Sequence, residues 1–443
     1  MRATMVGCSL VLCLILALTV TPSRAVDVSL IGADPGPNAT GEIPAWEGYK
    51  NTPCPADLPP GSYIPNPWKD DKPLFRIDHT NVEEYKDRLS AGQIRRLERF
   101  KTFYMNVYQS RRTLEFFPEY YEKSRENLKT ARVTEEGQLE GFNGGVAFPN
   151  PKNGLEAIWN VRRLYMGDDT HAREARRIVA PSGKMKKLIW EVTVSTWDEG
   201  RMLSPGHENP EGYYQKIQQV YTYPTEEWGR AWLGVHYLDV KKKTDSWMYL
   251  PTMRRVRRTP TMRDGFQTEG EYTMDDLQEF MGDVTLWDWE LLGKREMYVS
   301  DNNYDLFLPD GTDADECMAG HLNPERIRYE LRRVWVVQGT LKPGVTHPYS
   351  KRVGYYDEDS WMPCTGERYD RRGNLWRMME VFPYADPCQK VRLWIGYTYQ
   401  NLETGRYDLF GGLRSEVPTT TIYNQGLIDE QEFSVQKLRE AGR

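Results

Sequence analysis

The sequence predicts a mainly antiparallel β protein, and three observations lead to that fold class. From Lys184 to about Leu402, apolar and polar residues alternate with a period of two, as on strands with one buried face. The alternating stretches are short and rich in Val, Tyr, Trp and Thr, and turn residues separate them. Helical patterns are lacking between most of them, which argues against alternating βα units. About ten strands therefore form a meandering sheet, and a sheet of that length must curl or close.

Residues 1–25 are typical of a secretory signal. Arg2 gives a basic start, and the uncharged apolar run from Leu10 to Leu18 is too short to span a bilayer as a helix. Ser23 and Ala25 are small residues at the positions that a signal peptidase requires. We therefore expect cleavage after Ala25 and an exported, soluble, periplasmic protein, with an uncleaved anchor as the alternative.

Composition divides the whole chain into four parts. The expected parts are 1–25, the signal peptide; 26–183, an extended arm and helices packed on the sheet; 184–402, the curved sheet; and 403–443, a tail with a short helix.

Helix signals are confined to the regions on either side of the predicted sheet. Up to about Lys72 the chain is rich in Pro, Gly and Asn, which indicates an arm without regular structure. Thr80 or Asn81 can cap one helix and Ser90 a second, and the stretch from Gly154 to Gly167 also has helical spacing. The tail is expected to end in a helix over roughly Asp429 to Glu440.

The charge and the cysteines limit the classes of partner. The formal net charge is −6, which disfavours nucleic acid as a partner because phosphate contacts need a basic face. An oxidising compartment permits disulfides, and the four cysteines outside the signal allow three pairings. We favour a Cys364–Cys388 disulfide because only a hairpin separates the two residues, with free thiols as the alternative. The four residues are Cys54, Cys317, Cys364 and Cys388.

The sequence lacks the local signatures of catalysis and metal binding. None of the six histidines lies three or four residues from another histidine, a single cysteine (Cys317) lies four residues from His321 without a further histidine or cysteine nearby, and no GxSxG motif is present. We therefore predict no catalytic residues, no metal site and no cofactor. His236 lies inside an alternating strand and is expected to be a packed or hydrogen-bonded residue.

An arginine-rich hairpin follows the strand from Asp245 to Leu250. Pro251 ends that strand, and the return strand carries several arginines that alternation sends partly outward. A solvated face that resists edge pairing is one interpretation, and a surface for anionic head groups or an acidic partner is the other. The residues of this basic surface are Arg254, Arg255, Arg257 and Arg258.

Seven segments resemble a family of unknown function whose members are described as outer-membrane lipoprotein-sorting proteins. The strand, the W-x-Y-x-P ending and the arginine-rich return are also similar to the central hairpin of LolA/LolB-type lipoprotein carriers. The segments run in order along the chain and are Gly41–Trp46, Asp70–Asp78, Phe148–Asn160, Arg254–Pro260, Trp287–Tyr304, Gly320–Gly344 and Tyr349–Trp361.

This resemblance implies a strongly curved, incomplete β-barrel with helices on or in its concave face, which would hold acyl chains. The implied function is a non-catalytic periplasmic carrier of a lipid or other hydrophobic molecule, with an envelope transport or outer-membrane protein as its partner. The alternative is a docking or structural partner in such a complex whose interior is filled by its own side chains, and an exported hydrolase ranks third.

Strand alternation suggests which residues would contact the ligand. The same residues could instead pack the core under the N-terminal helices. The predicted ligand-binding residues are Trp190, Val192, Val194, Trp232, Trp247, Tyr249, Trp335 and Val337.

Overall fold

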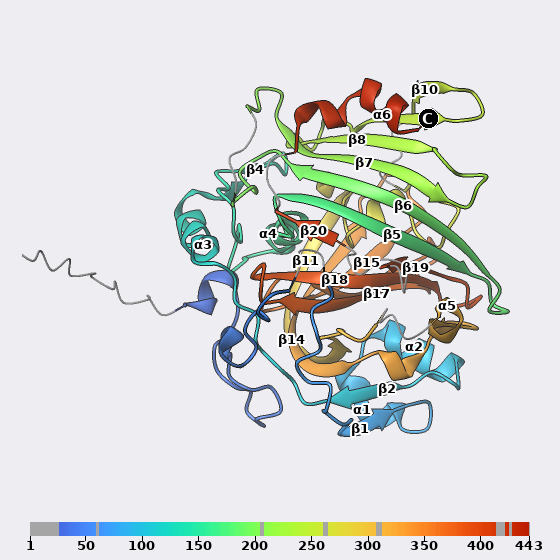
Figure 1. Cartoon of the computed structure of the whole chain (residues 1–443). Helices are drawn as coiled ribbons and strands as arrows, with labels where there is room; N and C mark the ends of the chain where they lie inside the picture. The colour runs from blue at the N-terminus through green and yellow to red at the C-terminus, as the bar shows by residue number, and fades with distance from the viewer. Residues whose placement is uncertain are drawn as a thin grey trace, which may run out of the picture.

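The computed structural model describes most of the chain as one long, strongly curved sheet with helices packed on it (Figure 1). The described residues are 26–58, 62–203, 208–259, 265–306, 312–412, 421–424 and 428–442. The expected signal peptide, residues 1–25, lies outside them. No helix within the described ranges has both the length and the apolar character needed to cross a membrane.

Sixteen strands of the described residues belong to the main sheet. β2 pairs with β14 in parallel, whereas the other ladders of this sheet are antiparallel. The strands are β1 Phe75–Ile77, β2 Met105–Tyr108, β5 Asp169–Val179, β6 Met185–Thr196, β7 Tyr213–Tyr223, β8 Ala231–Tyr237, β9 Asp245–Leu250, β10 Arg255–Arg258, β11 Trp287–Ser300, β14 Tyr329–Leu341, β15 Lys351–Asp357, β16 Pro363–Tyr369, β17 Leu375–Asp386, β18 Val391–Asn401, β19 Tyr407–Gly411 and β20 Thr421–Tyr423.

Two meanders make up most of this sheet. One runs from β5 to β10 and the other from β14 to β19, and the pairing of β19 with β5 joins them. The strand order starts at β1 and ends at β10, so the sheet stays open rather than closing into a barrel. The mainly antiparallel, curved and unclosed fold is thus confirmed. The sheet extends beyond 184–402, because β5 precedes that range and β19 follows it.

The remaining elements are short. Two small ladders pair β3 (Arg132–Val133) with β4 (Leu139–Glu140) and β12 (Cys317–Met318) with β13 (His321–Leu322). The helices are α1 Val82–Tyr85, α2 Ala91–Arg99, α3 Pro118–Thr130, α4 Gly154–Arg162, α5 Asp313–Glu316 and α6 Val435–Ala441, with 3-10 turns η1 Val28–Ile31, η2 Gly48–Asn51, η3 Lys86–Arg88, η4 Met274–Asp276, η5 Val284–Leu286, η6 Pro324–Arg326 and η7 Glu430–Phe433.

Side-chain caps start the two helices that contact the sheet near its middle. The Ser90 hydroxyl accepts from the Gln93 amide at 3.2 Å, which begins α2 at the expected residue. Asn153 caps α4 in the same way through the Glu156 amide at 2.9 Å. α2 packs on β16 and β17, α4 packs on β11 and β14, and α6 packs on β8, β9 and β10.

The interior around β14–β17 is filled, partly by buried charge. Arg332 is 2 % exposed and forms ion pairs with Asp301, Asp357 and Asp359 at 3.2, 2.8 and 2.8 Å. Arg112 pairs with Asp359 at 2.6 Å and also donates to backbone carbonyls of the N-terminal arm. Each buried charge therefore has a partner of opposite sign, as burial in a low-dielectric interior requires.

The disulfide differs from the predicted pairing. Cys54 of the N-terminal arm is bonded to Cys388, and Cys364 is a buried free thiol. The predicted Cys364–Cys388 pair is wrong because of strand register. Thr365 faces Glu380 across β16 and β17, so Cys388 lies about seven residues, roughly 23 Å, beyond the partner of Cys364.

Candidate functional site

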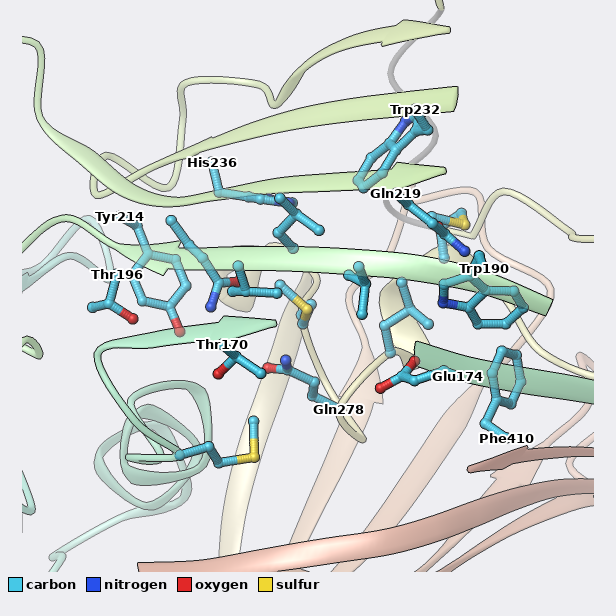
Figure 2. A pocket seen from close by; sticks show the side chains of 18 of the residues that line it. Thr170, Glu174, Trp190, Thr196, Tyr214, Gln219, Trp232, His236, Gln278 and Phe410 are labelled. Atoms are coloured by element: carbon cyan, nitrogen blue, oxygen red, sulfur yellow. The ribbon is translucent and has the colours of Figure 1, made fainter. Parts of the chain in front are cut away.

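A cavity of about 360 Å³ lies against the inner face of strands β5–β9 (Figure 2). Because side chains alternate across a strand, every second residue of each strand faces it. The wall residues from these strands are Thr170, Glu174 and Arg176 of β5; Trp190, Val192, Val194 and Thr196 of β6; Tyr214, Gln215, Ile217, Gln219 and Tyr221 of β7; Trp232 and His236 of β8; and Ser246 and Met248 of β9.

Segments from other parts of the chain close the cavity on its remaining sides. The residues after α4 contribute Leu164 and Met166, and the segment around η4 contributes Leu277 and Met281. Aromatic side chains of the second meander complete the wall, and these are Trp394, Tyr397 and Phe410. The cavity thus forms where the two meanders meet, which no single stretch of sequence contains.

Aromatic rings gather at one end of this cavity. Trp190 lies 6.0 Å from Phe410 between ring centroids, and Tyr397 stacks on Phe410 at 4.9 Å. Burial raises the pKa of Tyr272 to about 12, and it also raises the pKa of Tyr397. These phenols therefore stay protonated at neutral pH and present rings and hydroxyls rather than charges.

One carboxyl group interrupts this apolar wall. Glu174 lies directly across from Trp190 in the β5–β6 ladder, and the Trp190 indole N–H donates a hydrogen bond to it. Burial raises the pKa of Glu174 to about 7, and the hydrogen bond opposes part of that rise. Glu174 is the single carboxylate among the described residues that line the cavity.

Four of the eight predicted ligand-binding residues come together at this cavity. They share the inner face of β6 and β8, and they are Trp190, Val192, Val194 and Trp232. His236 also lines it and lies 3.2 Å from the Thr244 hydroxyl through its Nδ1.

The other four predicted residues lie elsewhere. Tyr249 belongs to a cluster with Phe433 and Leu438, and Trp247 packs against that cluster, so both lie under the C-terminal helix. The neighbouring residue Met248 faces the cavity instead. The face of β9 that was predicted is not the face that lines the cavity. α6 makes the outer face of β9 apolar as well, so alternation gives no sign of which face is concave.

Trp335 and Val337 are in the filled part of the interior. Trp335 stacks on Trp361 with ring centroids 5.3 Å apart, and Val337 is 1 % exposed in the same core cluster. These two residues fit the alternative of core packing beneath the N-terminal helices, since α4 packs on β14.

The four arginines of the basic surface are exposed on the β9–β10 hairpin. Arg258 forms an ion pair with Asp245. The turn before β10 lies beside the β7–β8 turn, because Gly229 is close to Pro251. Exposed apolar side chains of the same edge are Tyr223, Trp228 and Met253.

Within the described ranges, no group of three or more His, Cys, Asp or Glu side chains is arranged to hold a metal ion. The buried His347 instead lies 3.1 Å from Asp275, inside a cluster that also contains Arg352. His321 lies 2.8 Å from the Thr102 hydroxyl. These histidines are structural partners of neighbouring groups.

Sequence reasoning missed Glu174, Gln278 and the segment around η4. The signal for Glu174 was a carboxyl on the apolar-facing register of "HAREARRIV", but the strand was assigned to the helical part of the chain. Gln278 lies in a loop far from β5 in sequence, so no local pattern could place it at the cavity.

Two comparisons with known proteins address the family. The model of the family described as "Protein of unknown function (DUF1329)" matches residues 76–439. The uncharacterized protein PA3922 of Pseudomonas aeruginosa is 32 % identical over 418 residues, which cover 93 % of this chain and 91 % of that protein. The chain belongs to the DUF1329 family, and the resemblance that its motifs indicated is confirmed.

Solved structures with low sequence identity are similar to parts of this fold. A DUF1329 family protein from Desulfovibrio piger is 14 % identical with a TM-score of 0.45, covering 64 % of this chain and 97 % of its own. A putative outer membrane lipoprotein-sorting protein domain from Vibrio parahaemolyticus is 17 % identical with a TM-score of 0.44, covering 65 % of this chain and 98 % of its own. The LolA superfamily protein NE2245 from Nitrosomonas europaea is 13 % identical with a TM-score of 0.39, covering 65 % of this chain and 100 % of its own.

Proposed function

We propose that this protein is a non-catalytic carrier that holds a hydrophobic molecule in the cavity between its two meanders. The observation that carries the proposal is the cavity itself, about 360 Å³ in volume and walled largely by aromatic and aliphatic side chains. Sites for small molecules have this size and lining, with a few polar groups that orient the ligand. Burying an apolar ligand there contributes roughly 25 cal/mol per Å² of apolar surface.

Two other functions fit the site less well. A scaffold with a self-filled interior would be packed throughout, whereas here only the β14–β17 part is filled. A hydrolase of the glycosidase kind would need a pair of carboxylates, and the described wall of the cavity contributes Glu174 alone. The Cys54–Cys388 disulfide supports the exported location, because disulfides persist in oxidising compartments.

Filling the cavity tests the carrier function. The substitution Val194→Phe places a larger ring in the cavity and is expected to weaken binding of the neutral fluorescent probe N-phenylnaphthylamine at least about tenfold. The matched control is Thr193→Phe, the adjacent position whose side chain faces the other side of β6. Titration of probe fluorescence is the measurement. A wild-type protein that takes up no probe, or equal binding by the Val194→Phe variant, would contradict the proposal.

The basic surface suggests where such a carrier meets a membrane. Arg254, Arg255 and Arg257 are exposed beside the exposed side chains of Trp228 and Met253. Cationic residues next to aromatic and apolar ones are typical of contact with anionic lipid head groups, at about 1 kcal/mol per basic residue. We assign this edge to docking on an anionic membrane surface.

Vesicle flotation tests that assignment. Replacing the three arginines by serine is expected to lower association with phosphatidylglycerol vesicles at least about tenfold, with little effect on neutral vesicles. The matched control replaces three lysines at the opposite end of β9, Lys241, Lys242 and Lys243, by serine. Equal losses in both variants would mean that net charge alone is responsible and would refute the docking edge.

A further inference from the structure

The polar groups of the cavity define which ligand it can hold. Glu174 and Gln278 both extend into it, Glu174 beside Trp190 and Phe410, and Gln278 on the side of Thr170 (Figure 2). The two residues come from β5 and from the segment between η4 and η5, so two separate elements supply polar ends to a wall that is largely aromatic and aliphatic.

Glu174 has no ion pair with an arginine or lysine in the part of the chain that the structure describes. Its hydrogen bond from Trp190 satisfies one of the several acceptor positions of a carboxylate. An ionised carboxylate in an apolar site is costly unless donors or a cation compensate it. The remaining acceptor positions are therefore available to a ligand inside the cavity.

The backbone that carries Gln278 is held in an unusual conformation. Gln278 and Glu279 have φ values of +53° and +74°, left-handed values that are unfavourable for residues other than glycine. The buried Glu279 offsets this cost, because it pairs with Arg368 at 3.1 Å and accepts from the Tyr356 hydroxyl. Strain that the surrounding structure compensates often accompanies a functional position, and here it fixes Gln278 at the cavity.

The cationic side chains around the cavity already have partners of their own. Arg176 donates to Asp408 at 2.7 Å, and Arg230 lies 2.7 Å from Glu227. Arg163 pairs with Asp198. The other titratable groups that line the cavity are His236, Tyr165, Tyr214, Tyr221, Tyr272, Tyr397 and Tyr423. Glu174 is thus the ionisable group that a ligand head would meet uncompensated.

We infer that the cavity selects amphiphiles whose polar end donates a hydrogen bond and carries no negative charge, such as an alcohol or an amine, and that it excludes anionic ends of the same size. This inference rests on the proposed carrier function. A donor head satisfies the free acceptor positions of Glu174, whereas an anionic head would add a second negative charge to an apolar space. Specificity then comes from repulsion as much as from attraction.

Displacement of bound N-phenylnaphthylamine by three ligands of equal chain length tests the inference. At about pH 8.5, decanol and decylamine are expected to displace the probe at roughly tenfold lower concentration than decanoate. At about pH 6, where Glu174 is mostly protonated, the difference between decanol and decanoate should shrink. Glu174→Gln should bind decanoate about tenfold more tightly than the wild type at the higher pH, which removes most of the preference for decanol over decanoate.

The control substitution and the ligand pattern separate the outcomes. Glu191→Gln changes an exposed carboxylate on the neighbouring strand and should leave the order of the ligands unchanged. If the three ligands displace the probe equally, or if Glu174→Gln keeps the wild-type order, the selectivity is refuted and the carrier function stands. If the wild type binds neither the probe nor any of the ligands, both proposals are refuted.

Discussion

The two meanders enclose interiors of opposite kind. Around β14–β17, Arg332 and its neighbours fill the space with ion pairs whose members are almost fully buried. Against β5–β9, most inward side chains are aromatic, aliphatic or neutral and polar, and they leave a cavity of about 360 Å³. The same kind of curved antiparallel sheet thus serves as a packed support in one half and as a container in the other.

The difference shows how a large sheet can keep a cavity open. Ion pairs and hydrogen bonds in the filled half are directional, so they fix the strands and the segment around η4 in one arrangement. Asp276 of that segment pairs with Arg352 and Arg368, both at 2.6 Å. Strands β5–β9 then need no packed core along the cavity, because the interior around β14–β17 holds the opposite wall of the cavity in place.

The largest expected effect on stability comes from disrupting the ion pairs buried around β14–β17. Arg332→Met removes the cation that Asp301, Asp357 and Asp359 share. Asp301 keeps Arg392 and Asp359 keeps Arg112, but Asp357 loses the arginine that compensates it, and an uncompensated buried carboxylate is strongly destabilising. We expect the free energy of unfolding to fall by about 3–5 kcal/mol, measured by urea denaturation. The control Arg295→Met removes an exposed arginine on the neighbouring strand β11 and should change stability by less than about 0.5 kcal/mol. Equal stability of the two variants would show that the network does not support the fold.

A smaller effect on stability is expected from Glu174, whose carboxyl group lines the cavity. The pKa of Glu174 is raised to about 7 in the folded state, above its ordinary value, so between those two pKa values the folded state keeps a proton that the unfolded state releases. Its contribution to stability therefore falls as pH rises through this window, by about 1–3 kcal/mol in total. Glu174→Gln should remove that slope and be more stable than the wild type above about pH 7.

Unfolding curves measured between about pH 5 and pH 8 check this prediction. Glu191→Gln, which removes an exposed carboxylate of β6, should keep the wild-type slope. If the stability of the wild type does not change across this pH range, Glu174 has a compensating partner in solution. The two meanders would then not differ in whether their buried charges are paired.

The cysteines and β7 show where sequence reasoning fails. Cys364 and Cys388 are close in sequence, but the register of β16 and β17 separates them, and the N-terminal arm supplies Cys54 as the partner of Cys388. β7 lacks a clear apolar face in the sequence, because Gln215 and Gln219 occupy its inward positions. Those polar residues interrupt the apolar pattern for the same reason that they line a ligand cavity.

The sequence by itself determined the class of fold, the family and the inner face of β6, where Trp190, Val192 and Val194 alternate over a strand whose other face is polar or partly exposed. Only the tertiary structure decided that β19 pairs with β5, that Trp247 and Tyr249 face α6, and that Glu174 meets the cavity without a cation from the described residues. Alternation is a local property of a strand and reveals its two faces. Which face is concave, and what closes the space above it, depends on contacts between residues hundreds of positions apart.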